Sequence, residues 1–384
     1  MAVRTGRIGL VGCVAVAALT ATAFTTPAHA DSGSGHQATQ KAMDAAVAAG
    51  VPGVAGQAKD AHGTWKGTSG VGDLDSGAER GAHDRYRVGS VTKTFVSTVL
   101  LQLQAEGALD LDDTVERWLP GVVNGNGHDG SKITVRQLLN HTSGIFNYTA
   151  DPDIARKAFT TDFLKHRYDT YTPEQVVAVA MSHKPTFEPG ADWSYSNTNY
   201  VLAGMVVEKV TGESWEDEIE ERVIDPLDLD ATSLPGTDPT MTRPSSRAYS
   251  KLAPPDSEGK TYDVTEMNPS VAGAAGAMIS DSADLNRFYS ALMRGKLLPA
   301  QELKEMKTTV PVGDDAPNMS YGLGLMKMGG LSCGKEVWGH SGGINGSSTY
   351  GVTTEDGRHS LAFNFNGDWA GEAGPLVEGE FCGS

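Results

Sequence analysis

Residues 87–96 read RVGSVTKTFV, and the rest of the chain is organised around this stretch. Ser90 stands three residues before Lys93 at the start of an apolar segment, so the two side chains fall on the same helical face. Further apolar residues recur at helical spacing as far as Gly107, which supplies a stop. The pattern predicts a mostly buried helix with a nucleophile and a base side by side.

The sequence context of Ser90 separates it from two other serines with the same spacing to a lysine. Ser257 and Ser332 lie in Pro-rich or Gly-rich contexts that predict turns. Burial and the positive end of a helix would both disfavour the ammonium form of Lys93. A lysine that is neutral near pH 7 can take the proton of Ser90. The alternative is that Ser90 only caps the helix and Lys93 lies on the surface.

Residues 1–30 have the features of a secretory signal peptide. Two arginines precede an apolar run, and AHA at residues 28–30 matches the small-x-small cleavage pattern. We therefore expect a secreted, extracellular protein that is cleaved after Ala30, with residues 31–384 forming the mature chain and no stable membrane anchor. A lipoprotein cleavage box before Cys13 is less favoured, because the hydrophobic region preceding it would be too short.

Charge and cysteine content narrow the classes of partner. Loss of Arg4 and Arg7 with the signal lowers the formal net charge by two, from −17 to −19. A chain this acidic is a poor partner for nucleic acid or an anionic membrane. Cys13 also leaves with the signal, and the remaining pair, Cys333 and Cys382, predicts a disulfide in an exported chain. We expect no metal and no other cofactor, since these cysteines lie in no cluster of ligand spacing.

Secondary-structure patterns place strands at both ends of the chain and helices between them. They predict helices at residues 37–49, 201–210 and 282–293, and strands at residues 53–59, 64–70, 321–328, 336–339, 347–353 and 359–364. We expect an α/β fold with one antiparallel sheet built from N- and C-terminal strands, flanking helices and an inserted, mostly helical domain. The α/β part would cover about residues 40–115 and 275–384, and the insertion about residues 116–274.

Three stretches in the predicted insertion carry further candidates. Residues 133–144 predict a short helix with His141 at its C-terminal end. His141 could be a general base, but a histidine beside a glycine stop is more often structural. Residues 187–200 predict an irregular polar and aromatic loop, and the small residues at 273–277 predict close packing along a cleft wall.

Three short motifs follow one another in the chain: SVTK at residues 90–93, YSN at residues 195–197 and HSG at residues 340–342. This arrangement resembles the penicillin-recognising serine hydrolases, the superfamily of serine DD-peptidases and class C β-lactamases. The resemblance covers about residues 84–382 and is strongest toward exocellular D-alanyl-D-alanine carboxypeptidases/transpeptidases. Each motif is weak alone, but three in order with matching flanks make a chance match improbable.

The resemblance implies a role for each motif residue. Ser90 would attack a carbonyl and form an acyl-enzyme, while Lys93 and Tyr195 would share the proton transfers, either one being the acylation base. A Lys93 ammonium would lower the pKa of Tyr195. Asn197 would bind Lys93 and a substrate amide. His340 would line the cleft near the leaving group.

The resemblance also implies an oxyanion hole made by the backbone N–H groups of Ser90 and Gly343, with Gly342 beside them in the substrate site. Relatives that cleave a terminal D-alanine hold its carboxylate with a Thr at the position of Gly343 and an Arg on the preceding strand. That strand carries Lys327 here, which is therefore a predicted substrate-binding residue. If Lys327 points outward, amides, esters or internal peptide bonds would be preferred. Val271 replaces a large aromatic residue and predicts a wider pocket.

These observations predict a secreted serine acyl-hydrolase or acyltransferase of the D-alanyl-D-alanine carboxypeptidase type. Its substrates would be peptidoglycan-like or other D-amino acid peptides, and β-lactams would be covalent ligands. A D-stereospecific amidase, peptidase or esterase on the same scaffold is the alternative that the altered carboxylate site favours. A class C β-lactamase comes third. A non-catalytic penicillin or peptidoglycan sensor is the remaining alternative, although all the catalytic positions are filled.

Overall fold

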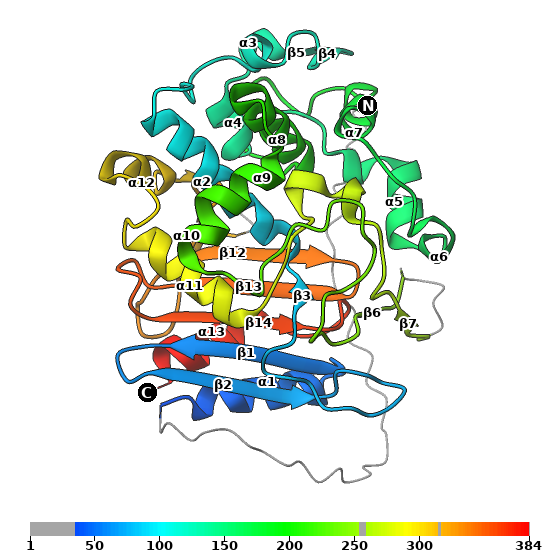
Figure 1. Ribbon diagram of the computed structural model, residues 1–384, viewed down its shortest axis with the longest axis vertical. Coiled ribbons are helices and arrows are strands. Elements are labelled where there is room, and N and C mark those ends of the chain that lie inside the picture. Colours follow the sequence, from blue (N-terminus) through cyan, green and yellow to red (C-terminus); the bar gives the residue numbers. More distant parts are fainter. Residues whose placement is uncertain (1–34, 253–258, 314–315, 384) are drawn as a thin grey trace, which may run out of the picture.

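The computed structural model describes residues 35–252, 259–313 and 316–383 (Figure 1). The predicted signal peptide at residues 1–30 and the predicted turn at Ser257 lie outside these described residues. Within them, no helix combines the length and apolar character needed to cross a membrane.

An eight-stranded antiparallel sheet occupies the lower half of the molecule in Figure 1, below most of the helices, in the order β2-β1-β14-β13-β12-β11-β10-β9. Its strands are β1 (Gly53–Lys59), β2 (Thr64–Gly70), β9 (Val310–Pro311), β10 (Met319–Tyr321), β11 (Met326–Met328), β12 (Val337–Ile344), β13 (Ser347–Thr353) and β14 (Ser360–Phe365). β1 pairs with β14, with Val54 opposite Phe365. The two ends of the chain therefore build one sheet, which confirms the predicted fold class.

Two strand predictions need correction. Residues 321–328 form two strands rather than one, because the chain turns between β10 and β11. Gly322 N–H donates to Leu325 O at 2.7 Å in this turn, and Gly324 adopts φ +66°. β12 continues past the predicted end at residue 339, since the following residues up to Ile344 also pair with β13.

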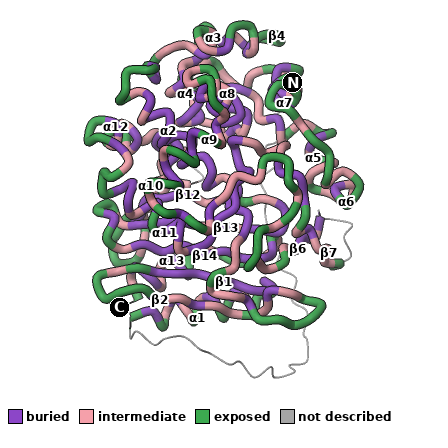
Figure 2. The backbone as a smooth tube through the Cα atoms, viewed as in Figure 1, coloured by how far each residue is buried: buried purple, intermediate pink, exposed green. Residues whose placement is uncertain are grey.

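Helices cover both faces of the sheet (Figures 1 and 2). α1 (Gln37–Ala48) and α13 (Ala373–Cys382) pack on each other over one face and share a core with β1, β2 and β14. α11 (Ser282–Met293) lies against the other face. The larger core on that side extends through α2 (Thr92–Ala105), α4 (Val135–Leu139), α7 (Pro173–Met181), α8 (Asn197–Thr211) and α9 (Trp215–Ile219). One continuous core thus joins the sheet to the helical segment.

The remaining short elements lie mostly around the helical part. They are α3 (Val115–Trp118), α5 (Pro152–Phe159), α6 (Phe163–His166), α10 (Asp225–Leu227), α12 (Ala300–Met306), β3 (Tyr86–Arg87), β4 (Asn124–Gly125), β5 (His128–Asp129), β6 (Tyr249–Ser250), β7 (Tyr262–Asp263) and β8 (Ile279–Ser280). β3 pairs with β8 directly before the Ser90 turn and so fixes where α2 begins.

Side-chain contacts tie the two ends of the described chain together. Cys333 and Cys382 form the predicted disulfide, with their Cα atoms 5.5 Å apart. The buried Glu380 carboxylate accepts a hydrogen bond from Thr39 Oγ1 at 2.7 Å and lies 2.6 Å from His359 Nε2. These contacts hold α13 against α1 and the sheet. The sequence analysis did not predict α13, whose short, glycine-containing segment lacks a regular apolar period.

Candidate active site

Ser90 lies in a single 3₁₀ turn, Gly89–Val91, that leads directly into α2. Gly89 adopts φ +53°, and a Cβ added there would lie 2.8 Å from Gly343 N. Only glycine therefore lets this turn approach β12 so closely. The N-cap of α2 is Val91, so Ser90 is not the capping residue that the alternative interpretation required.

Lys93 is fully buried beside Ser90. Its Nζ atom lies 2.9 Å from Ser90 Oγ, 2.8 Å from Asn197 Oδ1 and 2.6 Å from Ala275 O. Burial holds the pKa of Lys93 well below its usual range. A neutral amine has two N–H groups and one lone pair. Because Asn197 Oδ1 and Ala275 O can only accept, the lone pair faces the Ser90 hydroxyl.

Asn197 is held by the first turn of α8. The helix begins at Asn197 rather than at residue 201, so the irregular loop is shorter than predicted. Asn197 N–H donates to Asn147 Oδ1 at 3.1 Å, which satisfies a backbone donor at the helix start. The amide that contacts Lys93 is therefore fixed to a regular element.

Tyr195 precedes α8, and its ring centroid lies 4.9 Å from Lys93 Nζ. Burial raises the pKa of Tyr195 above its usual value, and the nearby Ser90 hydroxyl opposes this only in part. The expected lowering of the Tyr195 pKa is therefore wrong for the resting protein, because burial of the phenol is the largest influence on it. Tyr195 is a neutral phenol here and can donate a proton.

The backbone around Gly342 brings β12 into contact with the Ser90 turn. A Cβ added to Gly342 would lie 1.9 Å from Val88 O and 2.9 Å from Ser90 N. Gly343 lines the same cavity as Ser90, so the N–H groups predicted to form the oxyanion hole belong to adjoining segments. Gly342 itself faces Val88 and is not among the described cavity-lining residues, and its predicted substrate contact stays a prediction.

His340 is not among the described residues that line the Ser90 cavity, and its predicted role near the leaving group stays a prediction. Its ring is fully buried, with Nδ1 2.5 Å from Ser341 O and Nε2 2.8 Å from the Tyr321 hydroxyl. The carbonyl can only accept, so Nδ1 carries the proton and Nε2 accepts from Tyr321. Burial lowers the pKa of His340 to about 3. His340 is therefore a neutral internal residue, and its ring centroid lies 6.4 Å from that of Tyr195.

Lys327, the predicted substrate-binding cation, takes part in an ion pair. Its Nζ atom lies 2.8 Å from Glu336 Oε2 and 5.7 Å from the centroid of the Trp338 ring. Lys327 pairs with Trp338 across β11 and β12, and cross-strand partners share a face of the sheet. Lys327 is thus held by Glu336, and it is not among the described residues that line the Ser90 cavity.

A cavity of about 100 Å³ opens beside Ser90. Its described lining contains no charged side chain and is largely apolar, and it includes Val271, the residue that replaces an aromatic one. The apolar part includes Ile154, Ala158, Phe159, Met267, Val271 and Ile344, and the polar part includes Thr149, Asn197 and Asn345. The cavity suits a neutral substrate with an apolar side chain.

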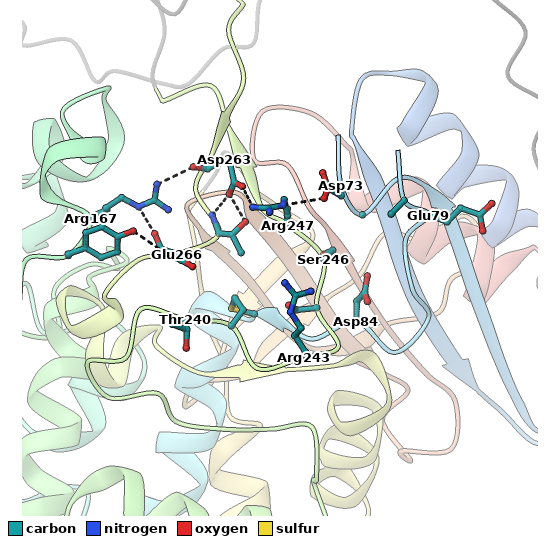
Figure 3. Close-up of a pocket in the computed structure, with 16 residues that line it drawn as sticks. Asp73, Glu79, Asp84, Arg167, Thr240, Arg243, Ser246, Arg247, Asp263 and Glu266 are labelled. Atoms are coloured by element: carbon teal, nitrogen blue, oxygen red, sulfur yellow. Dashed lines mark hydrogen bonds and ion pairs between the residues drawn. The ribbon is translucent and has the colours of Figure 1, made fainter. Parts of the chain in front are cut away.

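A second, larger hollow of about 640 Å³ contains none of the predicted site residues (Figure 3). Charged side chains line this hollow, and most of them form ion pairs or hydrogen bonds with one another. Arg247 lies 2.5 Å from Asp263 and 3.3 Å from Asp73, and Arg167 donates to Asp263 O at 3.2 Å. Within the described ranges, no group of three or more His, Cys, Asp or Glu residues could hold a metal ion. The candidate site is therefore the Ser90 cavity.

Several residues that complete the site were not predicted from the sequence. Ala275 O binds Lys93, although the small-residue run was expected only to pack closely. Asn147 holds the start of α8, and Asn345 Nδ2 donates to Ala158 O at 2.7 Å across the cavity wall. Backbone carbonyls and lone asparagines carry no spacing signal, so sequence patterns could not have singled them out.

Residues 37–375 match the family model described as Beta-lactamase, which is most of the chain. The chain belongs to the beta-lactamase family. Within this family the chain is 28% identical to Penicillin-binding protein 4* of Bacillus subtilis (strain 168), over 73% of this chain and 60% of that relative. It therefore spans less than two thirds of the length of that relative.

Two solved structures resemble the chain over nearly its whole described length. A D-stereospecific amidohydrolase from Streptomyces sp. is 61% identical, with a TM-score of 0.87 over 91% of this chain and 99% of that one. The D-amino acid amidase from Ochrobactrum anthropi SV3, complexed with D-phenylalanine, is 29% identical, with a TM-score of 0.77 over 89% and 97%. The family and these neighbours identify the protein as a serine hydrolase of the penicillin-binding protein and β-lactamase fold.

Proposed function

We propose that this serine hydrolase is a D-stereospecific amidohydrolase whose leaving group carries no carboxylate. The uncharged cavity beside Ser90 carries this proposal. A carboxypeptidase must hold the terminal carboxylate of its substrate, and a buried carboxylate without a partner is strongly disfavoured. Lys327, the predicted cation, is engaged by Glu336 instead. The cavity thus favours the amidase alternative over the D-alanyl-D-alanine carboxypeptidase that the sequence placed first.

The two structural neighbours support the same substrate class. The protein from Streptomyces sp. is named a D-stereospecific amidohydrolase, and it matches this chain at 61% identity over 91% of the chain. The second neighbour is named a D-amino acid amidase. The names of these two neighbours support the D configuration of the proposed substrate. The uncharged cavity of this chain supports a neutral leaving group.

Acylation follows from the contacts around Ser90. Lys93 Nζ accepts the hydroxyl proton while Ser90 Oγ bonds to the substrate carbonyl carbon. The oxyanion that forms lies between the N–H groups of Ser90 and Gly343, which stabilise its charge. Tyr195 then donates its proton to the leaving nitrogen as the C–N bond breaks. The products of this half-reaction are an ester on Ser90 and a free amine.

Transfer of the Ser90 proton to Lys93 makes Tyr195 more acidic just before Tyr195 protonates the leaving nitrogen. Lys93 becomes an ammonium when it takes the Ser90 proton, 4.9 Å from the Tyr195 ring centroid. A nearby positive charge lowers the pKa of a phenol, so Tyr195 becomes a better donor once the intermediate exists. Lys93 can then return its proton to Tyr195. Attack of water on the ester releases the carboxylic acid and restores Ser90.

The pH dependence of Ser90 acylation tests the neutral Lys93. Because burial holds the pKa of Lys93 well below its usual range, its lone pair is lost only when the pH falls through this lowered pKa. We expect the inactivation rate with phenylmethylsulfonyl fluoride, a neutral reagent, to rise with pH through one ionisation and reach a plateau well below pH 10. A rate that still rises near pH 10 would show that Lys93 keeps its proton.

A matched pair of substrates tests the proposed function. D-phenylalanyl-D-alanine and its C-terminal amide differ only in the terminal carboxylate. We expect kcat/KM to be at least about 10-fold higher for the amide, and at least about 100-fold higher for D- than for L-phenylalanine amide. A preference for the free carboxylate would contradict the proposal and restore the carboxypeptidase. The penicillin carboxylate likewise meets no cation in the described cavity lining, so we expect slow acylation by benzylpenicillin.

A further inference from the structure

His141 lies after the C-terminal end of α4, fully buried against the ring of Tyr195. The two ring centroids are 4.3 Å apart. His141 adopts φ +63°, a left-handed conformation that few non-glycine residues take and that His and Asn tolerate better than most. A strained backbone and a buried imidazole thus occur together next to the proposed proton donor.

His141 binds the chain on both sides of Tyr195. Ser194 N–H donates to the His141 carbonyl oxygen at 3.1 Å. Ser196 N–H donates to His141 Nδ1 at 3.3 Å. The left-handed conformation lets one residue present its carbonyl and its ring nitrogen to the same loop. Tyr195 is therefore fixed through both of its neighbours.

The hydrogen bonds define the state of the imidazole. Asn199 Nδ2 also donates to His141 Nδ1 at 3.1 Å, since Asn199 Oδ1 accepts from the Ser143 hydroxyl at 2.6 Å. Nδ1 is therefore an acceptor, and Nε2 carries the proton. Burial keeps the pKa of His141 well below its usual value. The imidazole stays neutral and Nδ1 stays available to Ser196.

Packing alone does not explain the choice of histidine. In the described part of the chain, His141 Nε2 has no hydrogen-bond partner although it is buried. Such an unpaired donor destabilises a fold, so an apolar ring would suit a position whose only task is to fill space. An apolar ring would lack the hydrogen-bond acceptor that Nδ1 provides.

We propose that His141 is the positioning residue that aims the Tyr195 hydroxyl at Ser90 and the leaving nitrogen. This inference rests on the proposed function, in which Tyr195 protonates the leaving amine. His141 is not among the described residues that line the Ser90 cavity. It acts through Tyr195 and touches no reacting atom.

The leaving group distinguishes this role from a structural one. An amine can leave only after it gains a proton, whereas p-nitrophenolate leaves without one. Misplacing Tyr195 therefore slows amide hydrolysis more than hydrolysis of an activated ester. General loss of folded protein lowers both rates by the same factor. The ratio of the two kcat/KM values thus reports the alignment of Tyr195 alone.

Two variants distinguish the contribution of the aromatic ring of His141 from that of its hydrogen-bond acceptor, Nδ1. His141→Phe keeps the aromatic contact with Tyr195 and removes the acceptor of the Ser196 N–H. His141→Asn removes the ring but tolerates the left-handed backbone and places an amide oxygen near the position of Nδ1. The tyrosine reference is Tyr195→Phe, which removes only the hydroxyl. Folded protein is quantified for each variant by its thermal unfolding transition.

The experiment compares D-phenylalanine p-nitroanilide with D-phenylalanine p-nitrophenyl ester. We expect Tyr195→Phe to lower the anilide/ester ratio by about 100-fold and His141→Phe to lower it by about 10-fold. His141→Asn should keep the ratio within about 3-fold of the original protein. In the Tyr195→Phe background, His141→Phe should change the ratio no further, because the two residues act as one unit.

Three results would overturn the inference. His141→Phe could lower both rates equally, it could lower the ratio even in the Tyr195→Phe background, or Tyr195→Phe could leave the ratio unchanged. None of these results affects the proposed function itself if the original protein still hydrolyses D-amides. The proposed function fails separately, when the original protein shows no turnover of the D-anilide at all.

Discussion

Replacing Ser90 by alanine is expected to lower kcat/KM for D-phenylalanine amide by at least about 10⁴-fold. The Ser90 hydroxyl is the only group of this residue that can form a bond with the acyl group. Alanine lacks this oxygen, and Lys93 acts as the base and not as the nucleophile. The backbone N–H of position 90 remains, so binding of the substrate should persist. Steady-state kinetics of the purified variant measure the effect.

The chain offers a matched control for this substitution. Ser332 also stands three residues before a lysine, but it lies in a turn on the surface, where its backbone N–H donates to Glu378 at 3.2 Å. Ser332→Ala should keep kcat/KM within about 2-fold, because surface changes of this kind are nearly neutral. Residual activity of Ser90→Ala above about 1% would point to another nucleophile. A sensor protein would instead show no turnover before the substitution.

The second large effect is expected at Gly342. A side chain there would place Cβ 1.9 Å from Val88 O, a backbone atom that cannot move without separating β12 from the Ser90 turn. Gly342→Ala should therefore destabilise the protein by more than about 3 kcal/mol. It should also lower kcat/KM by at least about 100-fold, because the two oxyanion-binding N–H groups are pushed apart.

Gly343→Ala is the control for Gly342→Ala. An added Cβ at Gly343 meets no atom within 4 Å, and the backbone N–H is retained. We expect kcat/KM within about 5-fold of the original and nearly unchanged stability. Urea unfolding and amide kinetics on both variants measure the contrast. If the two alanine variants behave alike, the close approach of β12 to the turn is not what holds the site.

Secondary-structure elements could be predicted where a local sequence pattern alone fixes their bounds. The bounds of β1 and β2 agree with the prediction, because the polar turn around Gly63 separates two β-compatible runs. The Ser90 turn and α2 followed from an apolar period that ends at Gly107. By contrast, α13 carries no such period, and it is held by contacts with α1 and by the disulfide. Contacts between distant segments do not appear in a local pattern.

The sequence predicted which residues belong to the candidate site better than it predicted how their side chains are oriented. Spacing alone placed Lys93 beside Ser90, since a helix fixes the relation of residues three apart. For His340 and Lys327 the sequence gives alternation within a strand, but the face that meets the cavity is set by how the sheet packs on α2 and α11. His340 is therefore buried beside Tyr195 rather than exposed in the cavity, and Lys327 is held by Glu336. The predicted secretion and cleavage after Ala30 stay predictions.

The central claim is that Ser90 carries an acyl group derived from a D-amino acid. The most direct test mixes the protein with D-phenylalanine p-nitrophenyl ester, stops the reaction with acid within the first turnovers and maps the modified peptide by mass spectrometry. We predict one phenylalanyl group on Ser90, none in the Ser90→Ala variant and a much lower yield with the L-ester. Turnover without an adduct, or an adduct on another residue, would contradict the account.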